Sequence, residues 1–245
     1  NRQARWVDAR TPVLVDLTDL SKRYARKMEH LGWVRDADES ARQKTEVIRP
    51  GYWVFESYTF GWDDQTPIPL VNFGYSLEEG TYLSENEALG AGFRSIHKAT
   101  GGMGVLVMDR RADADYVLQT LEGLPMAFAL RLRGDRILKD SEGRRLGSVR
   151  EVAHGLRLEG TTRLHRQIRG KKRKIQIDFG WQEVRVPGLK GRHWLVAAHG
   201  RFEHIDKRET EGWWYVLTTE PIRSAHEAER VLKWYRLRWK AEEAI

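Results

Sequence analysis

The stretch GVLVMDRRADADYVLQTLEGLPMAFALRLRG, residues 104–134, decides the fold class. Its continuous apolar run at 105–108 is typical of a strand buried on both faces. The segment 112–122 has helical spacing and stops at a glycine, and 126–134 then alternates as a second strand. We therefore predict an α/β chain with a central strand that ends directly on Asp109.

Upstream of this stretch, three segments read as strands: the apolar run 11–20 and the β-rich segments 51–60 and 66–76. Ser84, followed three residues later by Glu87, forms a capping box that predicts a helix ending at the next pair of glycines. The predicted order up to residue 134 is three strands, helix, strand, helix, strand.

Downstream, residues 135–202 alternate in short segments separated by glycine turns, which predicts a β-rich insertion. The segment GWWYVLTTEP at 212–221 predicts a further strand, and Ser224 with Glu227 forms a second capping box that begins the last helix. We predict a core formed by 1–134 and 212–245, interrupted by a basic insertion at 135–211.

This order of elements resembles that of the RNase H-like fold, a mixed sheet with helices on both faces. Sites in open α/β sheets form at the carboxyl ends of strands. Asp16 and Asp109 occupy such positions on two apolar strands. The sequence therefore points to an acidic site at this edge of the sheet.

Composition excludes several classes of protein. The chain has no cysteine, so it has neither a disulfide framework nor a thiol nucleophile. No apolar run approaches the ~20 residues that cross a membrane, and the first residues have no apolar signal segment. The absence of an initiator methionine and the end of the chain inside a predicted helix are expected of a fragment of a longer protein.

Positive charge is concentrated in one part of the chain. Between residues 131 and 174 there are fifteen Lys or Arg and five Asp or Glu, whereas the formal charge of the whole chain is +7. A basic segment beside a slightly acidic remainder favours binding of a polyanion in one place and acidic chemistry in another. A solvated basic sheet face is the alternative interpretation.

Both strand-borne aspartates have a structural alternative to a catalytic role. Asp109 precedes a helix, where it could cap a turn. Asp16 lies within VLVDLTDL, where it could be a hydrogen-bonded core residue, and Thr18 shares its face and could orient it. Asp19 competes as a candidate, but its odd offset from Asp16 places it on the opposite face of the strand.

The last helix carries Tyr235, Arg238 and Glu242 at spacings of three and seven residues, which puts them on one face with Trp239 between them. Glu243 is turned ~100° away from this face. An ion pair between Arg238 and Glu242, worth only a few tenths of a kcal/mol, is the alternative interpretation.

Three carboxylates from two strand ends and a helix can hold two divalent cations for phosphoryl transfer. Oxygen ligands favour Mg²⁺, with Mn²⁺ as the alternative ion. Arg238 is suited to contact a phosphate oxygen through its guanidinium fork.

These residues resemble a known family, the DDE transposases of the insertion-sequence-four type. In WYRLRWKAEE, the residues Tyr235, Arg238 and Glu242 match the family signature of Tyr, two residues, Arg, three residues, Glu. The segment VLVDLTDLSKRYARKMEHLG resembles the first-Asp segment, with Asp16 as the first acid. GVLVMDRRADADYVL resembles the second-Asp segment, with Asp109 as the second. WWYVLTTEP matches the strand that leads into the signature helix.

The sequence departs from the family pattern in three respects. The Lys that completes the signature would fall beyond Ile245. The family often has Asp-Arg-Gly where this chain has Asp109-Arg110-Arg111. The DNA-end-binding region before the core and the helical region after it are not in this sequence.

In that family the β-rich insertion helps hold the transposon end, and a Trp within it stacks on a flipped base. Trp181 and Trp194 are the candidates, with packing in a sheet core as the alternative for each. The run Lys171, Lys172, Arg173, Lys174 is expected at a hairpin tip that contacts DNA, with a localisation signal as the alternative.

The resemblance implies a transposase catalytic core that cuts and joins double-stranded DNA at transposon ends and target. Asp16, Asp109 and Glu242 would bind two Mg²⁺ or Mn²⁺ ions, and Tyr235 and Arg238 would position the terminal phosphates. It also implies a homodimer on DNA in a prokaryotic cytoplasm, associated with the nucleoid and not with a membrane. A decayed or domesticated DNA-binding protein and a structure-selective nuclease on the same fold are the alternatives.

Overall fold

The computed structural model describes residues 5–61, 66–81, 84–168, 171–202 and 211–242, and side chains at these positions except 164–174, 201–211 and 239–245. The chain divides into two compact units. The first consists of Asn1–Val105 and Gly123–Met126, and the second of Leu106–Glu122 and Ala127–Ile245. Each unit is described separately below.

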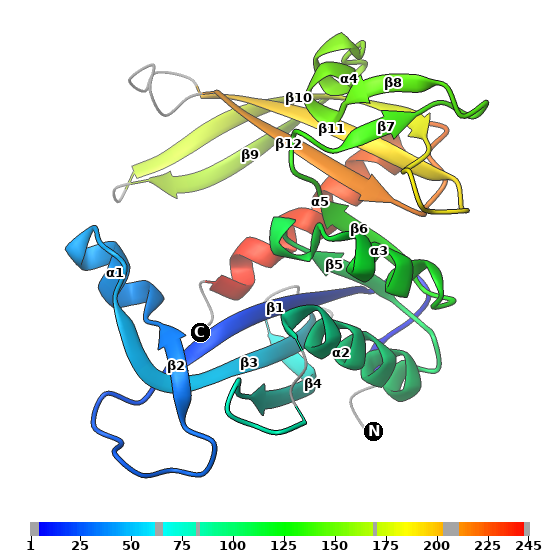
Figure 1. Cartoon of the computed structure of the whole chain (residues 1–245). Helices are drawn as coiled ribbons and strands as arrows, with labels where there is room; N and C mark the ends of the chain where they lie inside the picture. Colours follow the sequence, from blue (N-terminus) through cyan, green and yellow to red (C-terminus); the bar gives the residue numbers. More distant parts are fainter. Residues whose placement is uncertain (1–4, 62–65, 82–83, 169–170, 203–210, 243–245) are drawn as a thin grey trace. The chain divides into compact units, whose positions relative to one another are not determined.

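The first unit is built around the long strand β3, which runs from Ile48 to Phe60. It pairs antiparallel with three other strands (Figure 1): β1 (Pro12–Ser21), β2 (Gly32–Arg35) and β4 (Pro67–Tyr75). Strands β1, β3 and β4 confirm the three strands predicted before the first helix.

Helix α2 (Glu85–Thr100) begins and ends where the sequence signals predict. The Ser84 hydroxyl accepts the Glu87 N–H at 3.2 Å and donates to the Glu87 carboxylate at 3.0 Å. Gly101 ends the helix with φ 66°, a conformation that glycine adopts at little cost. The helix packs against β3 and β4 and buries its apolar face in the core of this unit.

A glycine permits close packing of α2 on β3. A Cβ atom at Gly92 would lie 2.2 Å from the ring of Phe55, which is fully buried. Phe55 also stacks on Phe73 at 5.0 Å and meets the edge of Phe93 at 6.4 Å, so its ring has no room to move aside. The sequence alone gives no indication of this contact.

We expect Gly92→Ala to destabilise the protein by about 2 kcal/mol, because the added methyl group overpacks a filled core. Denaturant unfolding followed by circular dichroism measures the change. Gly155→Ala is the matched control, since Gly155 is also helical and nothing lies within 4 Å of its Cβ position. Equal stability of the two variants would contradict the packing argument.

Two short elements of the first unit were not predicted. They are β2 and helix α1 (Ala37–Gln43), which Asp36 caps by accepting the Glu39 N–H at 2.9 Å. Arg23 binds both of these acids, at 3.3 Å from Asp36 and 2.8 Å from Glu39. The basic stretch between β1 and β2, residues 22–31, is a loop without a helix.

The second unit contains strands in the order β5-β6-β12-β11-β10-β9. From β6 onward all neighbours are antiparallel. These strands are β5 (Val105–Met108), β6 (Ala127–Arg131), β9 (Gly160–Ile168), β10 (Lys171–Val184), β11 (His193–Phe202) and β12 (Glu211–Thr218). The division between the units falls within β5, whose first residue, Val105, donates its N–H to the Thr11 carbonyl at 2.8 Å within the first unit.

Helix α3 (Asp115–Glu122) connects β5 to β6 and ends at Gly123, as predicted. A second small sheet follows, formed by β7 (Ile137–Lys139) and β8 (Arg145–Ser148). Helix α4 (Val149–Gly155) comes next, with a complete capping box that the sequence reading missed.

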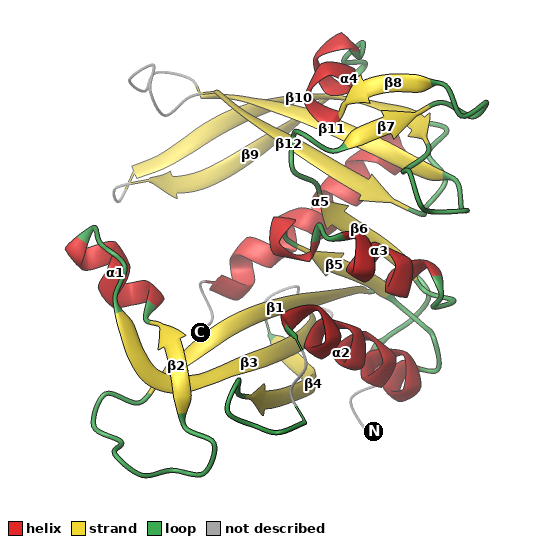
Figure 2. Ribbon diagram, in the orientation of Figure 1, coloured by secondary structure: helices red, strands yellow, loops and turns green. Residues whose placement is uncertain are grey.

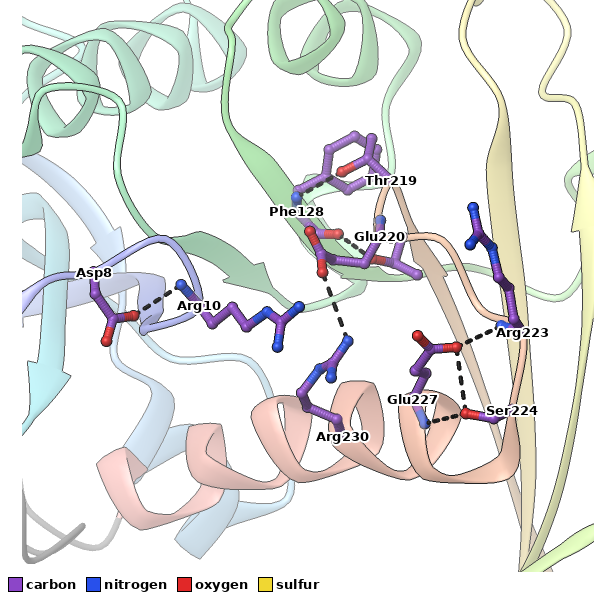
Figure 3. A network of polar contacts seen from close by, with 10 residues as sticks. Asp8, Arg10, Phe128, Thr219, Glu220, Arg223, Ser224, Glu227 and Arg230 are labelled. Carbon is purple, nitrogen blue, oxygen red and sulfur yellow. Dashed lines mark hydrogen bonds and ion pairs between the residues drawn. The ribbon is translucent and has the colours of Figure 1, made fainter.

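The last helix, α5, runs from Ala225 to Glu242. At its start Glu227 accepts the Arg223 N–H at 2.7 Å and contacts the Ser224 hydroxyl at 3.3 Å (Figure 3). The predicted capping pair is therefore present, with the carboxylate bonded one residue earlier than in the standard box. Glu220, just after β12, reaches Arg230 on α5 at 3.8 Å.

Helices α4 and α5 cover opposite faces of β12. Trp213 contacts His154 of α4, with ring centroids 4.6 Å apart, while its neighbour Trp214 contacts Tyr235 of α5 at 6.4 Å. Successive strand residues point to opposite faces, so the two helices lie on either side (Figure 2).

The predicted fold class is confirmed: the chain is α/β, with a mixed sheet, flanking helices and a β-rich segment before the last helix. Apart from the additional β2 and α1, the elements up to β6 follow the order that was predicted from the RNase H-like pattern. The boundaries at 134/135 and 211/212 between core and insertion stay a prediction, because the two compact units of the chain do not meet at these positions. Among the described residues, no helix is long and apolar enough to span a membrane.

Candidate acidic site and nucleic-acid surface

Asp16 lies in the middle of β1, between the buried residues Val15 and Leu17, because the strand continues to Ser21. The prediction that it lies at the carboxyl end of its strand is therefore wrong. Its own side chain is half-buried, and one carboxylate oxygen accepts the Leu17 N–H at 3.0 Å. In the antiparallel register Asp16 stands directly opposite Glu56 of β3. Residues paired in this way share one face, with Cβ atoms about 4.5–5.5 Å apart.

The sequence reading did not identify Glu56 as a site residue. Its only signal was that Glu56 is the single charged residue in the apolar and aromatic segment GYWVFESYTF. Partial burial raises the pKa of the Glu56 carboxyl. The register thus places two carboxylates on one face of the sheet, and carboxylate oxygens are ligands that Mg²⁺ accepts in proteins.

Asp19, the competing candidate, lies beside the start of α1 and not beside Asp16. Burial raises the pKa of its carboxyl, and the acids Asp36 and Asp38 raise it further, while the N–H of Ala37 acts in the opposite direction. These neighbours belong to the start of α1. Asp19 therefore lies against that helix, and its register opposite Trp53 puts it on the other face from Asp16.

Asp109 follows the last residue of β5, as predicted. Its carboxylate accepts the Arg111 N–H at 2.8 Å and caps the short 3₁₀ turn η2 (Arg110–Ala112). The side chain is half-buried. The turn-capping role considered from the sequence is thus present, and it is compatible with a second role as a metal ligand.

A neighbouring aspartate, Asp113, is the buried acid of this segment, and the sequence reading missed it. Asp113 accepts the Arg133 N–H and the Arg136 Nε, both at 2.6 Å, and Arg136 also contacts the exposed Asp115 at 2.7 Å. An open pocket of about 370 Å³ lies beside these side chains, with Asp135 on its wall. Because Arg136 neutralises Asp113, we interpret this cluster as structural.

Two of the three signature residues of α5, Tyr235 and Arg238, are buried. Tyr235 is 1% exposed, and its hydroxyl accepts a hydrogen bond from the Arg131 Nη1 at 3.5 Å. Arg238 is 9% exposed. Glu242 is the last residue of the helix, and its side chain lies outside the described part of the structure.

The structure brings Trp181 and Trp194 to the same face of neighbouring strands. Trp181 of β10 pairs with Val196 of β11, and Trp194 pairs with Glu183, so the two indoles are diagonal neighbours. Both are half-buried. Their expected contact with DNA stays a prediction, as does packing in the sheet.

The basic run Lys171, Lys172, Arg173 and Lys174 begins β10 and pairs with the last residues of β9. The backbone therefore places the run at the end of a hairpin, where it was predicted. The four side chains lie outside the described part of the structure, and their contact with DNA stays a prediction.

The predicted triad draws on both units: Asp16 belongs to the first, and Asp109 and Glu242 belong to the second. Their convergence stays a prediction. Among the side chains that the structure describes, no group of three or more His, Asp or Glu residues is placed to hold a metal ion.

Comparison with known proteins gives similarity to solved structures only. The sequence matches no protein-family model and no curated protein sequence. The cryo-EM structure of a piggyBac transposase synaptic complex with hairpin DNA resembles this chain at 10% sequence identity and a TM-score of 0.46. The match covers 94% of this chain and 38% of that chain. Similarity at this level assigns neither a family nor an activity.

Proposed function

We propose that this chain is the catalytic core of a DNA transposase that cuts and joins strands by two-metal-ion phosphoryl transfer. One observation carries the proposal: Asp16 faces Glu56 across two paired strands, half-buried and on the same face of the sheet. A pair of this kind offers oxygen ligands of the type that Mg²⁺ and Mn²⁺ accept. The ordered motifs that contain Asp16, Asp109 and Glu242 support the finer assignment to the insertion-sequence-four type.

The proposed metal ligands are Asp16, Asp109 and Glu242, all oxygen donors that suit Mg²⁺ or Mn²⁺. A bound pair of these ions would supply an acidified water and neutralise charge on the leaving oxygen. In the first step the water oxygen attacks the phosphorus at the element's end, and the 3′-oxygen leaves as a hydroxyl. In the second step that hydroxyl attacks a target phosphorus and releases a target 3′-hydroxyl.

The role proposed for Tyr235 and Arg238 is to position the terminal phosphates. Arg238 suits this role because its guanidinium can donate two parallel hydrogen bonds to a phosphate. The phenol of Tyr235 is fixed by Arg131, so a second arginine lies next to this part of α5. Two copies assembled on paired DNA ends, in a prokaryotic cytoplasm, are part of the proposal.

The predicted signature gives a sharp test of the third acid. In the full-length protein, with Mg²⁺ and DNA carrying its terminal repeats, Glu242→Gln is expected to slow strand cleavage by about 10³-fold, the effect of losing roughly 4 kcal/mol of transition-state stabilisation. Glu243→Gln is the matched control, because it makes the same change at the next residue, which is not part of the predicted signature. Gel assays of nicking and strand transfer measure both variants.

The outcomes separate the candidate functions. Equal rates for Glu242→Gln and the wild type would remove Glu242 from the site. Salt-dependent DNA binding without metal-dependent cleavage would favour a DNA-binding protein that does not cut. Cleavage without joining of the 3′-hydroxyl to target DNA would favour a nuclease.

A further inference from the structure

One face of the first unit's sheet runs from the acidic pair to an exposed tryptophan. Alternate residues of β3 share this face with the residues that pair opposite them on β1 and β2. In order along β3, the pairs are Glu56 with Asp16, Val54 with Thr18, Tyr52 with Leu20, Pro50 with Trp33, and Ile48 with Arg35. We call these ten residues the β3 face.

The far end of the β3 face is open to solvent. Trp33 is 62% exposed, Ile48 48% and Leu20 45%, which makes them three of the most exposed large apolar side chains among the described residues. The opposite face is covered: Val34 is 2% exposed, and Phe55 is fully buried under α2. An apolar sheet face left open beside a covered one indicates a binding surface.

The segment at this open end carries several cations. Residues 20–35 contain five Lys or Arg and one acidic residue, Glu29, and of these five Arg23 is paired with Asp36 and Glu39 at the start of α1. Arg35 is exposed and shares the face with Trp33, and the loop between β1 and β2 carries the exposed Arg26 and Lys27. The same loop carries Tyr24, which is 95% exposed. Exposed aromatic rings interleaved with cations are the pattern by which proteins bind unpaired nucleic-acid strands.

We propose that the open end of the β3 face holds unpaired DNA that leads to the acidic pair. Trp33 stacks on a base, and Arg35 and neighbouring loop cations contact the phosphates. Trp33 stands opposite Pro50, six residues along β3 from Glu56. At about 3.3 Å per residue this is about 20 Å along the strand.

This inference rests on the proposed function and adds a second DNA contact, formed by residues other than those of the predicted insertion contacts. The exposed cations Arg26, Lys27 and Arg35 favour a polyanion over an apolar protein segment. A stacked base explains an exposed indole better than duplex DNA does, because duplex bases are already stacked. The surface therefore suits flanking or target DNA that has been opened next to the cleaved phosphate.

The test measures DNA affinity in EDTA, so that it does not depend on cleavage. Full-length protein is titrated with a forked DNA and with a duplex of equal length, by fluorescence anisotropy. Trp33→Ala is expected to weaken binding of the fork about tenfold and binding of the duplex much less, while Trp33→Phe stays within about threefold of the wild type. Arg35→Gln is expected to lower the slope of log affinity against log salt by about one.

Tyr116→Ala is the matched control, since Tyr116 is an aromatic side chain that is 42% exposed on α3 of the second unit. Circular dichroism checks that each variant is folded. If the wild type binds and cleaves DNA but Trp33→Ala binds both DNAs equally well, the β3 face proposal fails and the proposed function stands. If Trp33→Ala instead abolishes self-association in light scattering with DNA affinity unchanged, the face belongs to a second copy and the proposal is overturned. If the wild type does not bind DNA, both proposals fail.

Discussion

Replacing Asp109 by Asn is expected to slow metal-dependent strand cleavage by about 10³-fold while the protein stays folded. Asn removes the negative charge that a divalent cation requires but remains a good residue for capping the turn at Arg110–Ala112. Asp109 is half-buried and its hydrogen bond is to the backbone two residues on, so the substitution leaves no buried partner without its bond. A loss of activity would therefore reflect the loss of a metal ligand and not a loss of folding.

Asp16→Asn is expected to give the same loss for the same reason, since it removes one charge from the pair with Glu56. Nicking of DNA that carries the terminal repeats measures both rates. Asp115→Asn is the control, because the Asp115 side chain is 76% exposed and contacts only Arg136 among the ion pairs of the described residues. Cleavage at the wild-type rate by Asp109→Asn would refute the assignment.

A second experiment distinguishes a metal ligand from a residue that merely supports the site. Cysteine at position 109 offers a softer ligand, which Mg²⁺ rejects and Mn²⁺ tolerates better. Asp109→Cys is expected to recover part of its activity in Mn²⁺ but none in Mg²⁺. Equal inactivity with both ions, in a folded protein, would indicate that Asp109 does not touch the metal.

Features that depend on local signals could be predicted from the sequence. The caps at Ser84 and Ser224 fix the starts of α2 and α5, because side chain and backbone partners lie three residues apart. The four-residue strand β2 and seven-residue helix α1 were missed because each is too short to show a period.

Features that depend on distant pairing could not be predicted. The position of Glu56 opposite Asp16 follows from a register between strands 40 residues apart, and a slip of one residue would have turned Glu56 to the other face. Similarly, the sequence has aspartates at 109, 113 and 115, and only the folded turn shows that Asp113 is the buried one. The meeting of Asp16 with Asp109 and Glu242 depends on two units of the fold at once and stays a prediction.

For the buried acid Asp113 we expect the opposite of Asp109: a loss of stability and not of activity. Asp113→Ala is expected to destabilise the protein by about 3 kcal/mol. The substitution removes a carboxylate that is 1% exposed and accepts two hydrogen bonds, one from the Arg133 N–H and one from the Arg136 guanidinium. Arg136, itself 15% exposed, would keep only the solvent-exposed Asp115 as a partner. The N–H of Arg133 would lose its acceptor as well.

Denaturant unfolding of matched variants tests this account. Asp115→Ala breaks the other half of the same arginine's contacts but is expected to cost no more than about 1 kcal/mol, since that pair is exposed to water. Asp113→Ala combined with Arg136→Leu should be more stable than the sum of the single changes predicts, because it removes the unpaired charge together with its partner.

At a temperature where Asp113→Ala is folded, its cleavage rate should match the wild type, since Arg136 already neutralises this carboxylate. A loss of cleavage as large as that of Asp109→Asn, in folded protein, would make Asp113 part of the catalytic site and contradict its interpretation as structural.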